Sequence, residues 1–159
     1  SDVYKRQYLG KGNTNIWGQR LASTIEKIMH YELDTIFNEY DRSAQLEYPG
    51  GITTRSFKGA DSFWTGLRSS FPHAKFKVHH VIGRDDKNMP PRAAVRWSLH
   101  GKHDGFGAFS EPTGAEVFVL GITHAEYGEL IQGEPKIRRE WTLFDEVSIW
   151  KQILMYKKY

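Results

Sequence analysis

Three apolar runs in the second half of the chain decide its fold. They are AAVRWSLHGKH (93–103), EVFVLGITH (116–124) and KIRREWTLF (136–144). Each run is long enough for a full strand and is rich in β-branched and aromatic residues, which favour strands. The connectors between the runs are too short for crossover helices. We therefore expect antiparallel strands over 92–103, 116–127 and 136–144 that pair in sequence order.

The segments before these runs alternate between helical and strand patterns. Apolar residues recur at helical spacing over 16–28 and again over 33–40, which predicts two helical segments with a break near 30–32. The turn Pro49-Gly50-Gly51 predicts a hairpin within residues 44–57. The other predicted elements are a helix from Gly59 to Phe71, a strand over 76–82 and a short C-terminal helix over 147–154. This order is typical of an α+β fold in which a strongly bent antiparallel sheet wraps over N-terminal helices.

The length of 159 residues is that of one domain. We expect the domain to span residues 12–156, with residues 1–11 an arm or a cloning remnant, unless they are the end of a preceding domain. The chain has no cysteine, and therefore no disulfide framework and no thiolate chemistry. No apolar run reaches the roughly 20 residues of a membrane span, and no signal-peptide core begins the sequence. We therefore expect a cytoplasmic protein that binds no membrane.

The charge pattern argues against nucleic acid as a partner. The net charge is only +3, and the 22 Lys and Arg residues are scattered among 19 acidic ones without a basic block. The aromatic fraction of 14% is more informative, because so many rings suit an apolar cavity as well as a core. The expected ligand is an apolar small molecule.

A series of short motifs runs through the same part of the chain. In order they are Arg96-Trp97, Gly101-x-His103-x-Gly105, Pro112-Thr113-Gly114, and Ile137-x-x-Glu140-Trp141 followed by Asp145. This order resembles that of the SnoaL-like polyketide cyclases, a branch of the nuclear transport factor 2-like (NTF2-like) superfamily. The resemblance implies a cone-shaped fold whose mouth opens on a hydrophobic pocket.

The resemblance also implies a reaction, an intramolecular aldol closure in which a pocket carboxyl group acts as acid and base. That carboxyl group would follow the tryptophan of the last motif, where this chain has Thr142. A second polar pocket position corresponds to Thr123. Because a hydroxyl group cannot replace a carboxylate as general base, we expect the acid or base to come from other residues.

The candidate catalytic residues are His103, Glu140 and His124. On a regular strand His103 shares the inward side of Trp97, while His100 faces outward. His103 is an acid or base at the end of its strand, or else a structural residue that bonds a backbone group of the glycine-rich connector.

The position of Glu140 depends on the register of the last two strands. Pairing around their loop brings Glu140 opposite Thr123 or His124. If both face inward, Glu140 orients the imidazole or serves as the base itself, and a dry site would raise its pKa. If both face outward they form a solvated contact, and a salt bridge to Arg96 or Arg138 would instead lower the pKa of Glu140.

The inward side of the strands defines the expected pocket. Gly121 lies on that side, and its missing side chain would leave room for a ligand. The expected lining residues are Trp97, Val117, Val119, Thr123, Thr142, Phe63 and Trp64. We expect no cofactor and no metal, because the histidines lack helical i, i+4 spacing and there is no cysteine. The outward set includes Phe118, Leu120 and Ile122, which predicts a homodimer through the outer face of the sheet.

Two functions fit these patterns. The first is a SnoaL-like small-molecule enzyme that uses acid/base chemistry in an apolar conical pocket. The second is a non-catalytic ligand-binding or dimerisation domain of the same fold, which the threonines at positions 123 and 142 favour. A desolvated His or Glu with a shifted pKa beside a pocket would support the enzyme, and a cone filled by its own side chains would support the alternative.

Overall fold

The computed structural model of the protein describes residues 10–128 and 134–157. Its helices are α2 (Ile16–Met29), α3 (Asp34–Glu39), α4 (Ser56–Ser70) and α5 (Glu146–Lys157). Its strands are β1 (Tyr40–Tyr48), β2 (Ile52–Arg55), β3 (Lys75–Arg84), β4 (Arg92–Lys102), β5 (Glu116–Tyr127) and β6 (Ile137–Phe144). No helix of the described residues is long and apolar enough to cross a membrane.

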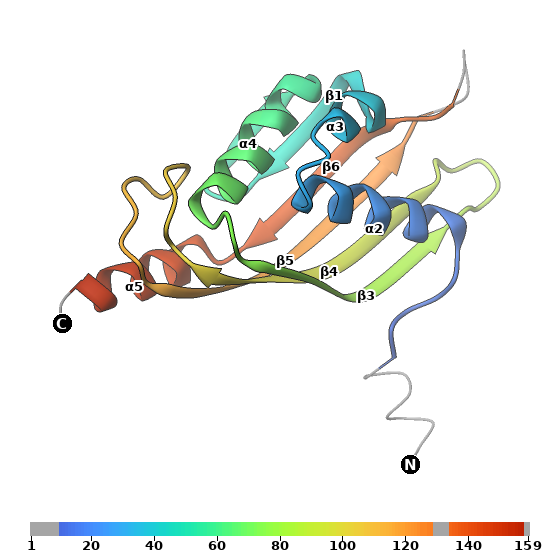
Figure 1. Cartoon of the computed structure of the whole chain (residues 1–159). Helices are drawn as coiled ribbons and strands as arrows, with labels where there is room; N and C mark the ends of the chain where they lie inside the picture. Colours follow the sequence, from blue (N-terminus) through green and yellow to red (C-terminus); the bar gives the residue numbers. More distant parts are fainter. Residues whose placement is uncertain (1–9, 129–133, 158–159) are drawn as a thin grey trace.

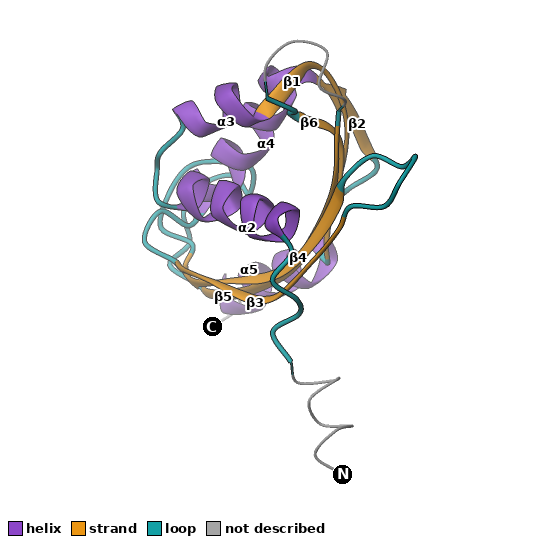
Figure 2. Ribbon diagram, turned by 90° about the vertical axis from the view of Figure 1, so that its right-hand side faces the viewer, coloured by secondary structure: helices purple, strands orange, loops and turns teal. Residues whose placement is uncertain are grey.

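The six strands form one sheet in the order β2-β1-β6-β5-β4-β3. Strands β3, β4, β5 and β6 pair antiparallel in sequence order, and no helix interrupts the connector 104–115, so the predicted meander is confirmed. Strand β1 pairs antiparallel with β2 and parallel with β6. The sheet bends strongly around α2, α3 and α4, as Figure 2 shows. The predicted α+β cone is therefore confirmed (Figure 1).

The helices follow the predicted periodicities with small shifts at their ends. Helix α2 begins after Asn15, whose side chain accepts a hydrogen bond from the Trp17 backbone N–H at 2.9 Å. The predicted break after α2 is present, with Tyr31 in the left-handed region at φ 68°. Tyr40, expected as the last residue of a helical stripe, is instead the first residue of β1. The left-handed Ser56 (φ 66°) ends the hairpin strand early and starts α4.

Lys11, just before the expected domain start, already contacts the sheet. The Val81 backbone N–H donates to the Lys11 carbonyl oxygen at 2.8 Å, and the Asn13 N–H donates to the Val81 carbonyl oxygen at 2.9 Å. Residues 1–9 lie outside the described part of the chain. The extent of the domain therefore stays a prediction.

A β-bulge in β6 sets the register of the last two strands. Tyr127 pairs with Ile137 but Glu126 pairs with Arg139, so Arg138 is an extra residue. Without it, continued pairing from Tyr127 would place Glu140 opposite His124. The bulge moves Glu140 by one position, opposite Ala125, and turns its side chain into the cone. Both registers expected from the sequence are therefore wrong.

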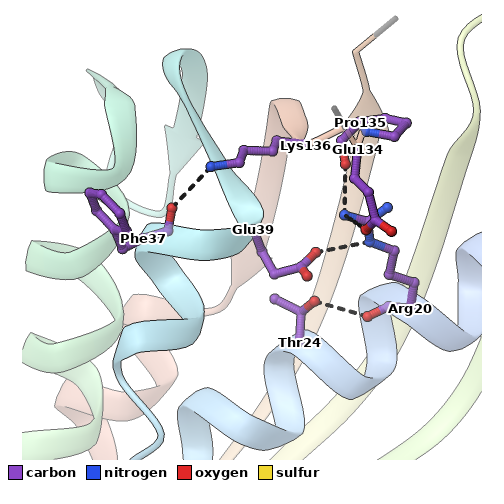
Figure 3. Close-up of polar contacts among 7 residues, drawn as sticks. All are labelled: Arg20, Thr24, Phe37, Glu39, Glu134, Pro135 and Lys136. Atoms are coloured by element: carbon purple, nitrogen blue, oxygen red, sulfur yellow. Dashed lines mark hydrogen bonds and ion pairs between the residues drawn. The ribbon is translucent and has the colours of Figure 1, made fainter. Parts of the chain in front are cut away.

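Arg20 joins α2 to α3 and to the start of β6 (Figure 3). Its Nε atom forms an ion pair with Glu39 at 3.0 Å, and its guanidinium donates to the Pro135 carbonyl oxygen at 2.6 Å. The same guanidinium lies 5.1 Å from the centre of the Tyr127 ring. These contacts fix the chain just before the bulge.

Aromatic side chains fill much of the interior of the cone. Trp64, Trp97, Tyr40 and Phe71 are all almost fully buried. A Cβ atom built on Gly121 would lie 2.3 Å from the Trp97 ring. The indole therefore occupies the space that the sequence suggested for a ligand, and that expectation is corrected.

Candidate functional site

A carboxyl group is buried inside the cone with aromatic partners. Glu140 of β6 is fully buried, and its Oε1 atom accepts a short hydrogen bond from the Tyr40 hydroxyl. The Tyr40 oxygen in turn accepts a hydrogen bond from Trp64 Nε1 at 3.0 Å. Strand β1 and helix α4 thus supply the groups that hold the acid of β6.

Burial changes the protonation of this cluster. It raises the pKa of Glu140 to about 7, although the Tyr40 hydroxyl opposes the shift by donating to the carboxylate. Burial and the nearby carboxylate also raise the pKa of Tyr40 and of Tyr48 well above the usual value for a phenol. Near neutral pH both forms of Glu140 are populated, while the two phenols stay protonated.

Tyr48 lies beside the same carboxyl group. Its hydroxyl lies close enough to interact with the Glu140 carboxyl, and this interaction, like that of Tyr40, opposes the rise in the pKa of Glu140. Within the described residues, Glu140 Oε2 and the Tyr48 hydroxyl are both buried without a hydrogen-bond partner. A buried acceptor and a buried donor thus lie near one another inside the cone.

A cavity of about 560 Å³ has Tyr48 in its wall. It is bounded by the β1–β2 hairpin, α4, the connector residues Ala108 and Phe109, and the start of α5. Tyr48 stacks on Phe63 in its wall, with ring centres 3.8 Å apart and an interplanar angle of 9°. Tyr48 thus belongs both to the cavity wall and to the surroundings of the Glu140 carboxyl.

Phe63 is the expected lining residue that does line this cavity. The side chains of Trp64, Trp97, Val117, Val119, Thr123 and Thr142 are instead packed in the core. Their inward orientation agrees with the predicted strand parity, but the core closes over them. The cavity therefore lies beside the β1–β2 hairpin and the first turns of α4, and not against the inward residues of β4 and β5 as the sequence suggested.

Comparison with solved structures gives a consistent result for the fold. A provisionally named SnoaL-like polyketide cyclase from Jannaschia sp. CCS1 superposes with a TM-score of 0.66 at 14% identity, over 89% of this chain and 96% of that one. IdmH, a provisionally named polyketide cyclase from Streptomyces antibioticus, superposes with a TM-score of 0.67 at 19% identity. The superposition covers 87% of this chain and 98% of IdmH. The chain has the SnoaL-like fold. A provisionally named hydroxylase from Streptomyces galilaeus, AclR, superposes with a TM-score of 0.62 at 15% identity. The superposition covers 86% of this chain and 77% of AclR. No family model and no curated protein matches the sequence.

Within this SnoaL-like fold, a neutral network occupies the position where the resemblance implies a carboxylate. Thr142 and Thr123 are opposite one another and their hydroxyl groups are hydrogen bonded at 2.9 Å. Trp97 Nε1 donates to Thr123 Oγ1 at 3.0 Å. The three buried groups satisfy one another, which favours a structural role for them.

His103 lies far from Glu140 in the SnoaL-like cone. Its backbone N–H donates to the Ala115 carbonyl oxygen, and its Nδ1 is hydrogen bonded to Thr113 Oγ1 at 2.9 Å. Ala115 and Ala125, the residue opposite Glu140, are ten positions apart, which is about 30 Å of strand. The imidazole thus contacts a side-chain hydroxyl of the glycine-rich connector rather than one of its backbone groups, and the role of His103 stays a prediction.

His124 lies on the other face of the sheet from Glu140. Its ring stacks on Trp141 with centres 5.1 Å apart, on the outside of the cone. Partial burial lowers the pKa of His124. The structure therefore does not bring the three candidate catalytic residues together. Among the described residues, no group of three His, Cys, Asp or Glu side chains is placed to hold a metal ion.

Tyr40 and Tyr48 are the site residues that the sequence analysis missed. Tyr40 is one hundred positions from Glu140 in the sequence, and the two meet because β1 runs parallel to β6. No local pattern predicts that pairing. Strand alternation could have placed Tyr48 on the inward side of β1, where it is buried.

Proposed function

We propose that the chain binds an apolar small molecule in the 560 Å³ cavity and transfers a proton to or from it through Glu140. The observation that carries this proposal is a buried carboxyl group, with a pKa of about 7, beside a residue of the cavity wall. A group that is half protonated near neutral pH can both take and return a proton. Perturbed acids of this kind are concentrated at functional sites.

The proposed reaction is proton transfer next to a carbonyl group. The Glu140 carboxylate takes a proton from the carbon beside the ligand's carbonyl and leaves an enolate. The resulting carboxylic acid returns the proton in a later step, so the residue is regenerated. Aldol closure of the polyketide cyclase type is one reaction that begins in this way. In this proposal Tyr48, which remains protonated and lies beside both the carboxyl group and the cavity, passes a proton between them.

One observation favours the alternative, a binding domain without catalysis. Glu140 has no exposed surface and does not line the cavity, whereas the stacked rings of Tyr48 and Phe63 do. If these rings do not move, a ligand in the cavity cannot reach the acid. The cavity would then serve binding alone.

Hydrogen exchange of an aromatic ketone distinguishes these two functions. We expect the protein to accelerate incorporation of deuterium beside the carbonyl of 1-tetralone in D₂O, followed by proton NMR. Glu140→Gln should reduce this acceleration by at least about 100-fold, the usual contribution of a general acid or base. The matched control is His124→Asn on the outer face, which should exchange at the parent rate.

Equal exchange rates in the parent protein and in Glu140→Gln would contradict the assignment of Glu140. Binding of 1-tetralone without any acceleration by the parent protein would favour the binding domain. The exchange assay needs no knowledge of the natural product, because it follows the proton alone.

A further inference from the structure

Two cationic side chains line one end of the cavity. Arg55 is the last residue of β2, and Lys58 lies in the first turn of α4. Neither side chain forms an ion pair or a hydrogen bond among residues 10–128 and 134–157. Thr54 and Ser56 line the same end, and the Ser56 hydroxyl accepts a hydrogen bond from the Lys58 backbone N–H at 3.1 Å. This corner therefore offers two uncompensated positive charges to a molecule that enters the cavity.

The acidic residue of the cavity wall lies at the other end. Glu146 begins α5, and its carboxylate packs against the hairpin turn, 2.8 Å from where a Cβ atom on Gly50 would be. Arg55 lies three positions along β2 from Ile52, which is next to this turn, and this is about 10 Å of strand. Glu146 thus forms no ion pair with the two cations. Between the ends, the wall is largely apolar, with Tyr48, Phe63, Leu67 and Phe144.

We infer that the cavity takes an apolar anion, an aromatic or aliphatic body that carries one carboxylate, sulfonate or phosphate group at Arg55 and Lys58. The inference rests on the proposed function for the use of this cavity as the ligand site. Charge-assisted hydrogen bonds from Arg and Lys are the usual means of holding such groups. With the charge at this corner, the apolar body would lie along the rings of Tyr48 and Phe63, toward Glu140.

A pair of fluorescent probes tests the inference. 8-Anilinonaphthalene-1-sulfonate and N-phenyl-1-naphthylamine share the same rings and differ by the sulfonate group. We expect the parent protein to bind the anion more tightly than the neutral probe. The double variant Arg55→Gln/Lys58→Gln should weaken binding of the anion about tenfold, as expected for two partly exposed charge contacts, and change the neutral probe less than twofold.

Two further variants complete the design. Arg42→Gln/Lys75→Gln removes the same charge from exposed positions that do not line the cavity. This variant should bind both probes with the affinity of the parent protein. Ala108→Trp places a large side chain in the cavity and should abolish binding of both probes. Raising the salt concentration should weaken binding of the anionic probe and leave binding of the neutral probe unchanged.

The outcomes separate this inference from the proposed function. Unchanged affinity for the anion in Arg55→Gln/Lys58→Gln, with the neutral probe still bound, overturns the inference and leaves the apolar ligand site in place. An equal loss of both probes in that variant overturns it as well, because the effect would not depend on charge. Full binding of both probes by Ala108→Trp removes the cavity as the ligand site and overturns both proposals.

Discussion

Burial of Glu140 links the stability of the protein to pH at the scale of a single residue. Its pKa rises from 4.5 to about 7 in the folded protein, so the folded state binds more protons than the unfolded state between these values. The contribution of Glu140 to the free energy of unfolding is therefore largest below pH 4.5, and it falls as the pH rises toward 7. The loss is on the order of 3 kcal/mol, at about 1.4 kcal/mol per pKa unit.

Replacement of Glu140 by Gln should remove this dependence. The variant's free energy of unfolding, relative to the parent, should rise by on the order of 3 kcal/mol between pH 4.5 and pH 8, because the amide does not ionise. Urea unfolding at several pH values measures the difference. Glu111→Gln, at an exposed residue, controls for the loss of one charge. A difference between Glu140→Gln and the parent that is the same at all pH values would contradict the raised pKa.

At this scale the sequence predicts side-chain direction better than partners. Alternation along β4 correctly places His103 inward and His100 outward. The orientation of Glu140 could not be predicted, because one extra residue in the bulge decides which face it takes. Its partner Tyr40 comes from a strand pairing of long sequence separation, which leaves no local signal.

At the scale of elements, contact between strands β4 and β5 depends on the absence of a side chain. Gly121 faces Trp97, and a Cβ atom there would lie 2.3 Å from the indole ring. Gly121→Ala should therefore lower the free energy of unfolding by about 1–3 kcal/mol, the usual cost of overpacking a core. Urea unfolding of the parent protein and of Gly121→Ala at pH 6 measures this change in the free energy of unfolding.

Gly128→Ala is the matched control for this substitution. A Cβ atom at Gly128 would have its nearest contact at 3.7 Å, an ordinary van der Waals distance. The control should unfold at nearly the parent urea concentration. Equal midpoints for Gly121→Ala and Gly128→Ala would show that Trp97 shifts to make room.

Most elements could be predicted from periodicity, and their ends less well. The three long strands and the break between α2 and α3 follow directly from apolar spacing. The end of β2 and the start of α4 differ from the prediction because a left-handed Ser56, which no residue pattern signals, turns the chain there. The position of the cavity also depended on these ends, since β2 and the first turn of α4 form one of its walls.

At the scale of the whole molecule, the outer face of the sheet leaves large apolar side chains in solvent. Phe118, Leu120, Ile122 and Leu143 are between 48% and 66% exposed. Apolar groups at this density on neighbouring strands are typical of an association surface. We expect a homodimer through this face, in which each copy covers the other's side chains.

Sedimentation at micromolar concentration tests the dimer. The parent protein should sediment at twice the monomer mass, and Leu120→Lys should shift it to the monomer, because a charge in an apolar interface is costly to bury. Ile16→Lys is the control, since Ile16 is 71% exposed but lies on α2, which covers the inner face of the sheet. A parent protein that stays monomeric would contradict the expectation.

The bulge in β6 has a consequence for the evolution of chain length. Removal of Arg138 would keep Ile137 opposite Tyr127 and Glu140 opposite Ala125, because the bulge residue has no partner of its own. Removal of Trp141 would instead shift every later residue, turning Thr142 outward and Leu143 inward. Descendants of this chain can therefore lose one residue at position 138 and keep the buried acid, whereas a gap three positions later would exchange the two faces of the strand.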